Sequence, residues 1–148
     1  MGCNNVVRLG RGVFFNIGTN PAYCWDGHKY VCEDDFKGEE PCLVYTFGVS
    51  NDPSFEEAMA AKGTFLSSKM GLLGSQNCIL ICPGCEVYAH DHTVNRFPST
   101  THKNLHFFKI GIGVSNTRVN KGEIKTLDTL LSDNAHKERI INYLKVCY

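Results

Sequence analysis

Gly48 and Asp91 are the two residues whose types and positions could build a ligand site. Gly48 has no Cβ, so a bound molecule can come close to the main chain there, and it directly follows an apolar run at residues 42–47. Asp91 ends a second such run and could accept hydrogen bonds from two neighbouring hydroxyl groups of a sugar. In open α/β sheets, a glycine turn and an acid about 20 residues further on bind the ribose of a nucleotide-like ligand.

The spacing of this pair is about twice what such a site normally has, because Asp91 follows Gly48 by 43 positions (91 − 48). The segment Thr64–Gly84 accounts for the excess, since without its 21 residues (84 − 63) the spacing would be 22 (43 − 21). A plainer alternative is that Gly48 forms a tight turn and Asp91 is a solvated strand end. One glycine with one acid is a weak signature, so the surrounding elements must decide.

The elements that would position the pair alternate between strand and helix. Residues 42–47 are a nearly continuous apolar, β-branched and aromatic run, which is typical of a buried strand. Ser54 and Glu57 have the spacing of a capping box, which predicts a helix that starts at Ser54. The pattern also predicts strands at 86–91, 105–110 and 140–146, and a helix from Thr126 through Leu131. This order predicts an α/β fold with a largely parallel sheet.

The N-terminal part of the chain has a different character. Residues 1–40 show no sustained period of about 2 or 3.6, and their Gly, Asn-Pro and Asp-Gly positions mark turns. One short strand is predicted there, at 29–32. We therefore expect residues 1–40 to form a loop-rich lead-in, and residues 41–148 to form one packed domain.

Composition excludes two classes of partner. Fifteen basic residues balance fifteen acidic ones without a long run of either sign, so the sequence predicts no nucleic-acid or anionic-membrane surface. The longest apolar run, Cys78–Cys82, is far shorter than the roughly 20 residues that a membrane-spanning helix needs. We expect a soluble chain with no transmembrane segment, and no signal-peptide core stands out.

Eight cysteines leave the redox state and the compartment open. A disulfide among Cys24, Cys32 and Cys42 is one alternative, which a secretory context would permit, and reduced thiols are the other.

A zinc site is a competing interpretation of the cysteines further along. Cys82 and Cys85 form a CxxC turn, with Cys78 before it and His90 and His92 after it. A second CxxC or a well-spaced histidine pair is missing, so we predict no metal site and treat these residues as ordinary cysteines. His106 lies in an apolar run, which favours a core position over a catalytic base, and no catalytic residue can be named.

Four segments, in order along the chain, resemble a family of animal methyltransferase-like proteins with a class I, S-adenosylmethionine-dependent, Rossmann-like fold. They are CLVYTFGVSNDPSFEEAMA, GCEVYAHD, LHFFKIGIGVS and INYLKV. The resemblance implies that Phe47, Gly48 and Val49 lie under the amino-acid and ribose end of S-adenosylmethionine, and that Asp91 holds the ribose diol. It also implies methyl transfer to an acceptor that the sequence does not identify.

The chain departs from the family pattern in three places. His92 follows Asp91 where proline is usual, Thr64–Gly84 has no counterpart, and the sequence stops shortly after Lys145, where family members continue. We therefore expect a Rossmann-like domain that is incomplete at its C-terminus and interrupted by a poorly packed loop at 64–84, both explained by translated intron sequence or by an error in the gene model. The alternatives are an inactive truncated product that retains cofactor or partner binding, and a zinc-binding module through Cys78, Cys82 and Cys85.

Overall fold

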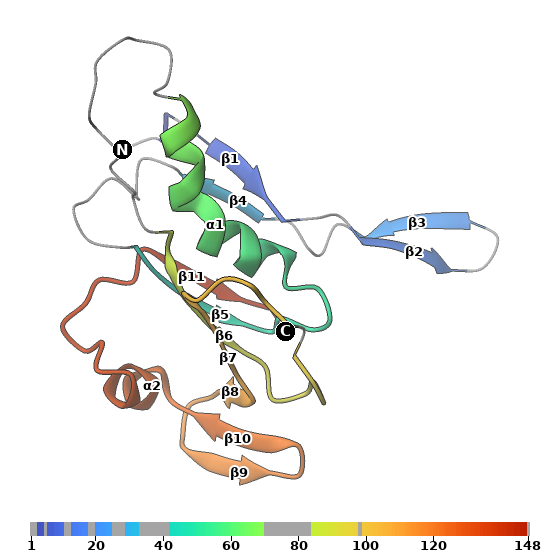
Figure 1. Cartoon of the computed structure of the whole chain (residues 1–148). Coiled ribbons are helices and arrows are strands. Elements are labelled where there is room, and N and C mark those ends of the chain that lie inside the picture. Colours follow the sequence, from blue (N-terminus) through green and yellow to red (C-terminus); the bar gives the residue numbers. More distant parts are fainter. Residues whose placement is uncertain are drawn as a thin grey trace.

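The core of the protein is a four-stranded parallel sheet. The computed structural model describes residues 3–4, 6–10, 13–17, 20–24, 29–32, 42–69, 84–97 and 99–147. The sheet has the order β11-β5-β6-β7 (Figure 1). Its strands are β5 (Leu43–Phe47), β6 (Glu86–His90), β7 (Leu105–Phe108) and β11 (Tyr143–Val146). The predicted α/β class with a parallel sheet is therefore confirmed.

Each face of the sheet is covered by one helix, because successive side chains of a strand point to opposite faces. Val44 of β5 packs with Phe55 and Met59 of α1 (Ser54–Lys69). Leu43, Tyr45 and Phe47 pack instead with Leu130 of α2 (Leu127–Asp133). Every residue of β5 is buried, as expected for a parallel strand that is covered on both sides.

Both predicted helix starts are confirmed. The Thr126 hydroxyl accepts a hydrogen bond from the N–H of Thr129 and caps α2. At the start of α1, the Ser54 N–H donates to the Asp52 carboxylate at 3.0 Å, while the capping box with Glu57 stays a prediction.

Helix α1 continues to Lys69, so the part of Thr64–Gly84 up to this residue is helical, although the sequence predicted a loop from Thr64 onward. Alanines at 58, 60 and 61 and Lys62 favour helix before Gly63, and Leu66 and Lys69 favour it afterwards, so one glycine does not end the helix. Residues 70–83 lie outside the described part of the chain.

The N-terminal part contains more strands than the sequence predicted. The predicted strand at 29–32 is confirmed as β4 (Lys29–Cys32), which pairs antiparallel with β1 (Val6–Leu9). A second hairpin joins β2 (Val13–Ile17) to β3 (Asn20–Cys24). Val31 of β4 is only 1% exposed and belongs to the same core cluster as α1, so the β1–β4 hairpin is part of the packed unit.

A small three-stranded sheet follows β7. The predicted strand at 105–110 is divided at Lys109 into β7 and β8 (Ile110–Ile112). Strand β10 (Gly122–Lys125) pairs parallel with β8 and antiparallel with β9 (Thr117–Val119). In the described part of the chain, no helix has the length and apolar character to cross a membrane.

Candidate functional site

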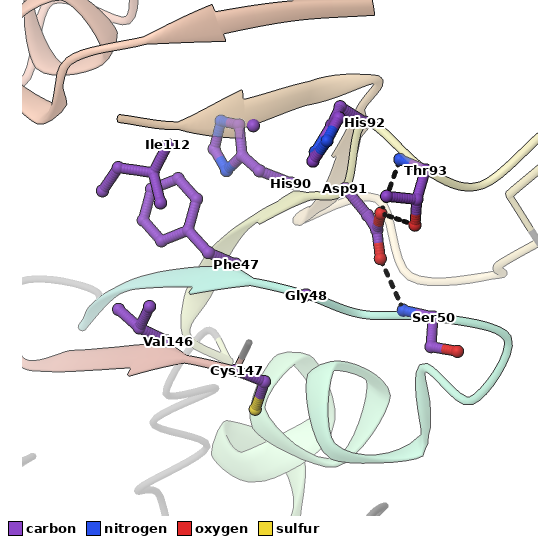
Figure 2. Close-up of a pocket in the computed structure, with 11 residues that line it drawn as sticks. Phe47, Gly48, Ser50, His90, Asp91, His92, Thr93, Ile112, Val146 and Cys147 are labelled. Carbon is purple, nitrogen blue, oxygen red and sulfur yellow. Dashed lines mark hydrogen bonds between the residues drawn. The ribbon is translucent and has the colours of Figure 1, made fainter. Parts of the chain in front are cut away.

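A pocket of about 400 Å³ lies at the carboxyl ends of β5, β6 and β11 (Figure 2). The chain passes from β5 through β6 to β7 on one side, and β11 then pairs with the other side of β5. Such a reversal of strand order is where open α/β sheets bind their ligands. The residues that line the pocket are Phe47, Gly48, Ser50, His90, Asp91, His92, Thr93, Gly111, Ile112, Val146 and Cys147.

Asp91 directly follows β6 and holds two loops of the pocket together. Its Oδ2 accepts a hydrogen bond from the Ser50 N–H at 2.8 Å. Its Oδ1 accepts from the N–H of Thr93 at 2.8 Å and from the Thr93 hydroxyl at 2.6 Å. Asp91 is 5% exposed, so it is not the solvated strand end of the plainer alternative.

The carboxylate of Asp91 is held in its charged form. Burial by itself would raise the pKa of Asp91, but the hydrogen bonds from Thr93 and Ser50 outweigh burial and hold it below its ordinary value. A carboxylate oxygen can accept more than one hydrogen bond, and Oδ2 has one donor in the contacts above. Asp91 can therefore still accept a hydrogen bond from a ligand.

Gly48 forms the turn that leaves β5. Its N–H donates to the carbonyl oxygen of His90 at 3.0 Å, and its φ is +79°, in the left-handed region that favours glycine. A Cβ at this position would lie 2.6 Å from the carbonyl oxygen of Cys147. Glycine is thus needed here because the backbone at Cys147, just after β11, lies against the turn.

The structure places three of the four residues predicted from the sequence at the pocket. Phe47, Gly48 and Asp91 line it, whereas Val49 is 3% exposed and packs in the core cluster on the α1 side. The reason is that Val49 is the first residue after the turn, where its side chain returns to the sheet face that α1 covers.

Several pocket residues were missed by sequence reasoning. Ser50 has a φ of +56°, which is uncommon for a residue other than glycine, and its N–H points to Asp91 (Figure 2). Thr93 follows Asp91 by two positions, a spacing at which an aspartate often binds the backbone, so this contact had a sequence signal. Ile112 and Cys147 had none, because their place depends on how distant segments fold together.

His90 was considered from the sequence only as a zinc ligand, but its ring belongs to an aromatic stack. Its centroid lies 4.9 Å from that of Phe47 and 5.0 Å from that of Phe108. Burial lowers the pKa of His90 to about 4, so its ring is neutral at pH 7.

The cysteines of the proposed zinc module have other roles or are not described. Cys85 forms a disulfide with Cys42, at the start of the neighbouring strand, and cannot ligate zinc in this state. Cys78 and Cys82 lie outside the described residues, within which no cluster of three or more candidate ligands could hold a metal ion. Cys32, also named as a disulfide candidate, pairs with Cys3.

An ion pair buried beneath the α1 face was not predicted. Lys145 of β11 donates to Glu56, in the first turn of α1, at 2.9 Å, and the two side chains are 7% and 0% exposed. This pair fixes the helix that follows the Gly48 turn to the strand that ends at the pocket.

Comparison with protein families adds an independent finding. A family model described as a methyltransferase domain matches residues 1–148. Searches of curated proteins and of solved structures found no significant match. Because the family match extends over the whole of this sequence, the chain belongs to the methyltransferase domain family.

Proposed function

We propose that this chain is a class I methyltransferase domain that binds S-adenosylmethionine in the pocket at the ends of β5, β6 and β11. The observation that carries the proposal is the charged, nearly buried Asp91 beside the Gly48 turn, at the point where the strand order reverses. Across the sheet from β7 to β11, the strands are the third, second, first and fourth in sequence. This is the order of one half of a Rossmann-like sheet plus the first strand beyond its switch point.

The pocket fits such a cofactor in size and chemistry. About 400 Å³ lies in the range of small-molecule sites, which combine an apolar wall with a few polar groups. Asp91 would accept hydrogen bonds from the ribose hydroxyls, and Phe47 would provide apolar contact. Gly48 and the buried Val49 would hold the turn in place. When bound, the cofactor supplies an activated methyl group, and the protein positions the acceptor against it.

The two disulfides bear on the cellular compartment in which the chain folds. Cys42–Cys85 joins the starts of β5 and β6 in the packed core, and Cys3–Cys32 ties the residues before β1 to the end of β4. Disulfides of this structural kind form in oxidising compartments. We therefore propose that the chain folds in the secretory pathway.

Binding is a better test than turnover. β11 is an edge strand of the sheet, with Leu144 47% and Val146 39% exposed, and we propose that the sheet of a complete domain continues past it. Methyl transfer would need those further elements, whereas the pocket already exists here.

Calorimetric titration with S-adenosylhomocysteine, the demethylated cofactor, tests the proposal. Wild-type protein should bind, and Asp91→Ala should weaken binding by about 1–3 kcal/mol through loss of charge-assisted hydrogen bonds. Asp128→Ala on the exposed side of α2 is the matched control and should leave the affinity unchanged. Absence of binding to folded wild-type protein would overturn the function, and equal affinity in Asp91→Ala would remove Asp91 from the site.

A further inference from the structure

His90, the last residue of β6, carries a ring nitrogen without a partner. Its Nδ1 lies 3.1 Å from the carbonyl oxygen of Tyr88, and because a carbonyl oxygen only accepts, Nδ1 must carry the proton. In the neutral ring Nε2 is therefore a hydrogen-bond acceptor. It is buried, since His90 is only 1% exposed, and it has no hydrogen-bond partner among the described residues. Native proteins rarely leave a buried acceptor unpaired, so this nitrogen requires an explanation.

The position of His90 in the pocket provides one. Figure 2 shows Phe47, Ile112 and Val146 on one side of the pocket, and Asp91 with its hydrogen-bonded neighbours on the other. The ring of His90 stacks against Phe47 and so belongs to the apolar wall. This wall combines apolar side chains with an acceptor nitrogen that is covered in this structure, and the two together would suit an aromatic base that carries an amino group. The opposite wall, with its carboxylate, suits a sugar.

We propose that Nε2 of His90 accepts a hydrogen bond from the exocyclic amino group of adenine, and that His90 thereby selects an adenosyl ligand. This inference rests on the proposed function and names the residue that would read the base. A ligand with a carbonyl oxygen at the same position would place two acceptors against each other, which is repulsive and leaves both unpaired.

The burial of Nε2 and the protonation state of His90 both bear on this proposed hydrogen bond. Nε2 is covered in this structure, so a side chain of the wall must move before the base can reach it. Since the pKa of His90 is lowered to about 4, the ring takes up a proton too weakly to serve as a general base at neutral pH. A neutral acceptor is the role that remains.

The test compares S-adenosylhomocysteine with S-inosylhomocysteine, in which a carbonyl oxygen replaces the amino group. Wild-type protein should bind the adenosyl compound at least about tenfold more tightly. His90→Phe keeps the stacked ring but removes the acceptor. It should lower the affinity for S-adenosylhomocysteine by roughly 5- to 50-fold and bring the ratio of the two affinities close to one.

Stability and a matched control separate this role from a structural one. His90→Phe should melt close to the wild-type temperature, because removal of the buried unpaired Nε2 offsets loss of the Nδ1 hydrogen bond to Tyr88. His106→Phe changes a half-buried histidine that packs at a tilt against Tyr88 and does not line the pocket, and it should preserve the affinity ratio.

Three results would overturn the inference. They are an unchanged affinity ratio in His90→Phe, a wild-type preference below about twofold, and no binding of either compound. The first two leave the proposed function intact, whereas the third rejects it as well. If His90→Phe does not fold, the wild-type comparison of the two compounds still decides.

Discussion

The backbone N–H of Cys85 donates a hydrogen bond to the carbonyl oxygen of Met59 at 3.3 Å, across the long segment that separates them in sequence. Gly84 lies so close to α1 that a Cβ there would overlap the carbonyl oxygen of Ala60. The side-chain amide of Asn104 donates to the carbonyl oxygens of Ala60 and Cys85 at 2.9 and 2.7 Å. The chain thus enters β6 beside the turn of α1 that contains Met59 and Ala60, shortly before Thr64.

This contact has the connectivity of a helix C-cap in a shorter chain. In the Schellman motif, a glycine ends the helix and the next residue donates to the carbonyl oxygen of the last helical turn. If Thr64–Gly84 were absent, Cys85 would follow Gly63 directly and would occupy the donor position that this motif pairs with Met59. We propose on this basis that Thr64–Gly84 is an insertion into an otherwise continuous helix-to-strand connection.

The first prediction is that a variant in which Gly63 is joined to Cys85 folds to the same parallel sheet. The hydrogen bond to Met59 and the disulfide to Cys42 can both form in it, and the loop between β5 and β6 becomes shorter. Its melting temperature should equal or exceed that of wild type. An unfolded or aggregated deletion variant would contradict the proposal, as would spliced transcripts that uniformly encode Thr64–Gly84.

The second prediction concerns the buried ion pair of Glu56 and Lys145. Lys145→Met leaves the Glu56 carboxylate buried without its partner and should destabilise the protein by about 3–5 kcal/mol in denaturant unfolding. The double variant Glu56→Leu/Lys145→Met should recover most of this loss. Arg118→Met removes an exposed ion pair with Glu123 and should cost far less than Lys145→Met, because water screens exposed charges. Equal losses at the two sites would show that burial does not matter here.

The third prediction is a pH dependence of stability that His90 causes. Because its pKa is about 4 in the folded protein against 6.5 for the free side chain, the unfolded chain binds a proton between these values that the folded protein does not. The free energy of unfolding should therefore fall as pH drops from 6.5 to 4, by about 3 kcal/mol from His90.

His90→Phe serves as the control for this window. The pKa of His136 is lowered in the same direction, by burial and by Arg139, so part of the slope should remain in this variant. The pKa values of Asp91 and Glu86 are also lowered, so their stabilisation is lost as pH falls below their ordinary values of 3.8 and 4.5, and only Glu86 contributes at the lower end of this window. The same slope in wild type and variant would remove His90 as the cause.

The parts of the fold that the sequence predicted well are those encoded by local patterns. Strand β5 and the Thr126 cap follow from neighbouring residues, so they could be located without knowing the tertiary structure. The strands β1 to β3 were missed because their short, Gly-rich hairpins show no sustained alternation. They are held by pairing between strands, and β1 also packs against the core cluster of α1, neither of which a local pattern records.

In the candidate site, too, the residues marked by local patterns could be predicted and the contacts between distant segments could not. Gly48 and Asp91 could be named because each directly follows an apolar run, which places both at one edge of a parallel sheet. The bond between Asp91 and Ser50 and the pairing of Lys145 with Glu56 join segments that are far apart in sequence. Such contacts depend on the strand order β11-β5-β6-β7, and the sequence predicted the strands but not their order.

The fourth prediction is that Gly48→Ala destabilises the protein and weakens ligand binding together. A φ of +79° is costly for alanine, and its Cβ would lie 2.6 Å from the carbonyl oxygen of Cys147, a backbone atom that cannot move without shifting the end of β11. We expect a loss of about 1–3 kcal/mol in unfolding free energy and a lower affinity for S-adenosylhomocysteine. Ser50→Gly is the opposite change in the same turn, because glycine relieves the strain of a φ of +56°, and it should leave stability within about 1 kcal/mol of wild type. If Gly48→Ala is as stable as wild type, the turn is not constrained as the structure shows. If it is destabilised but binds the ligand normally, Gly48 supports the fold and not the pocket.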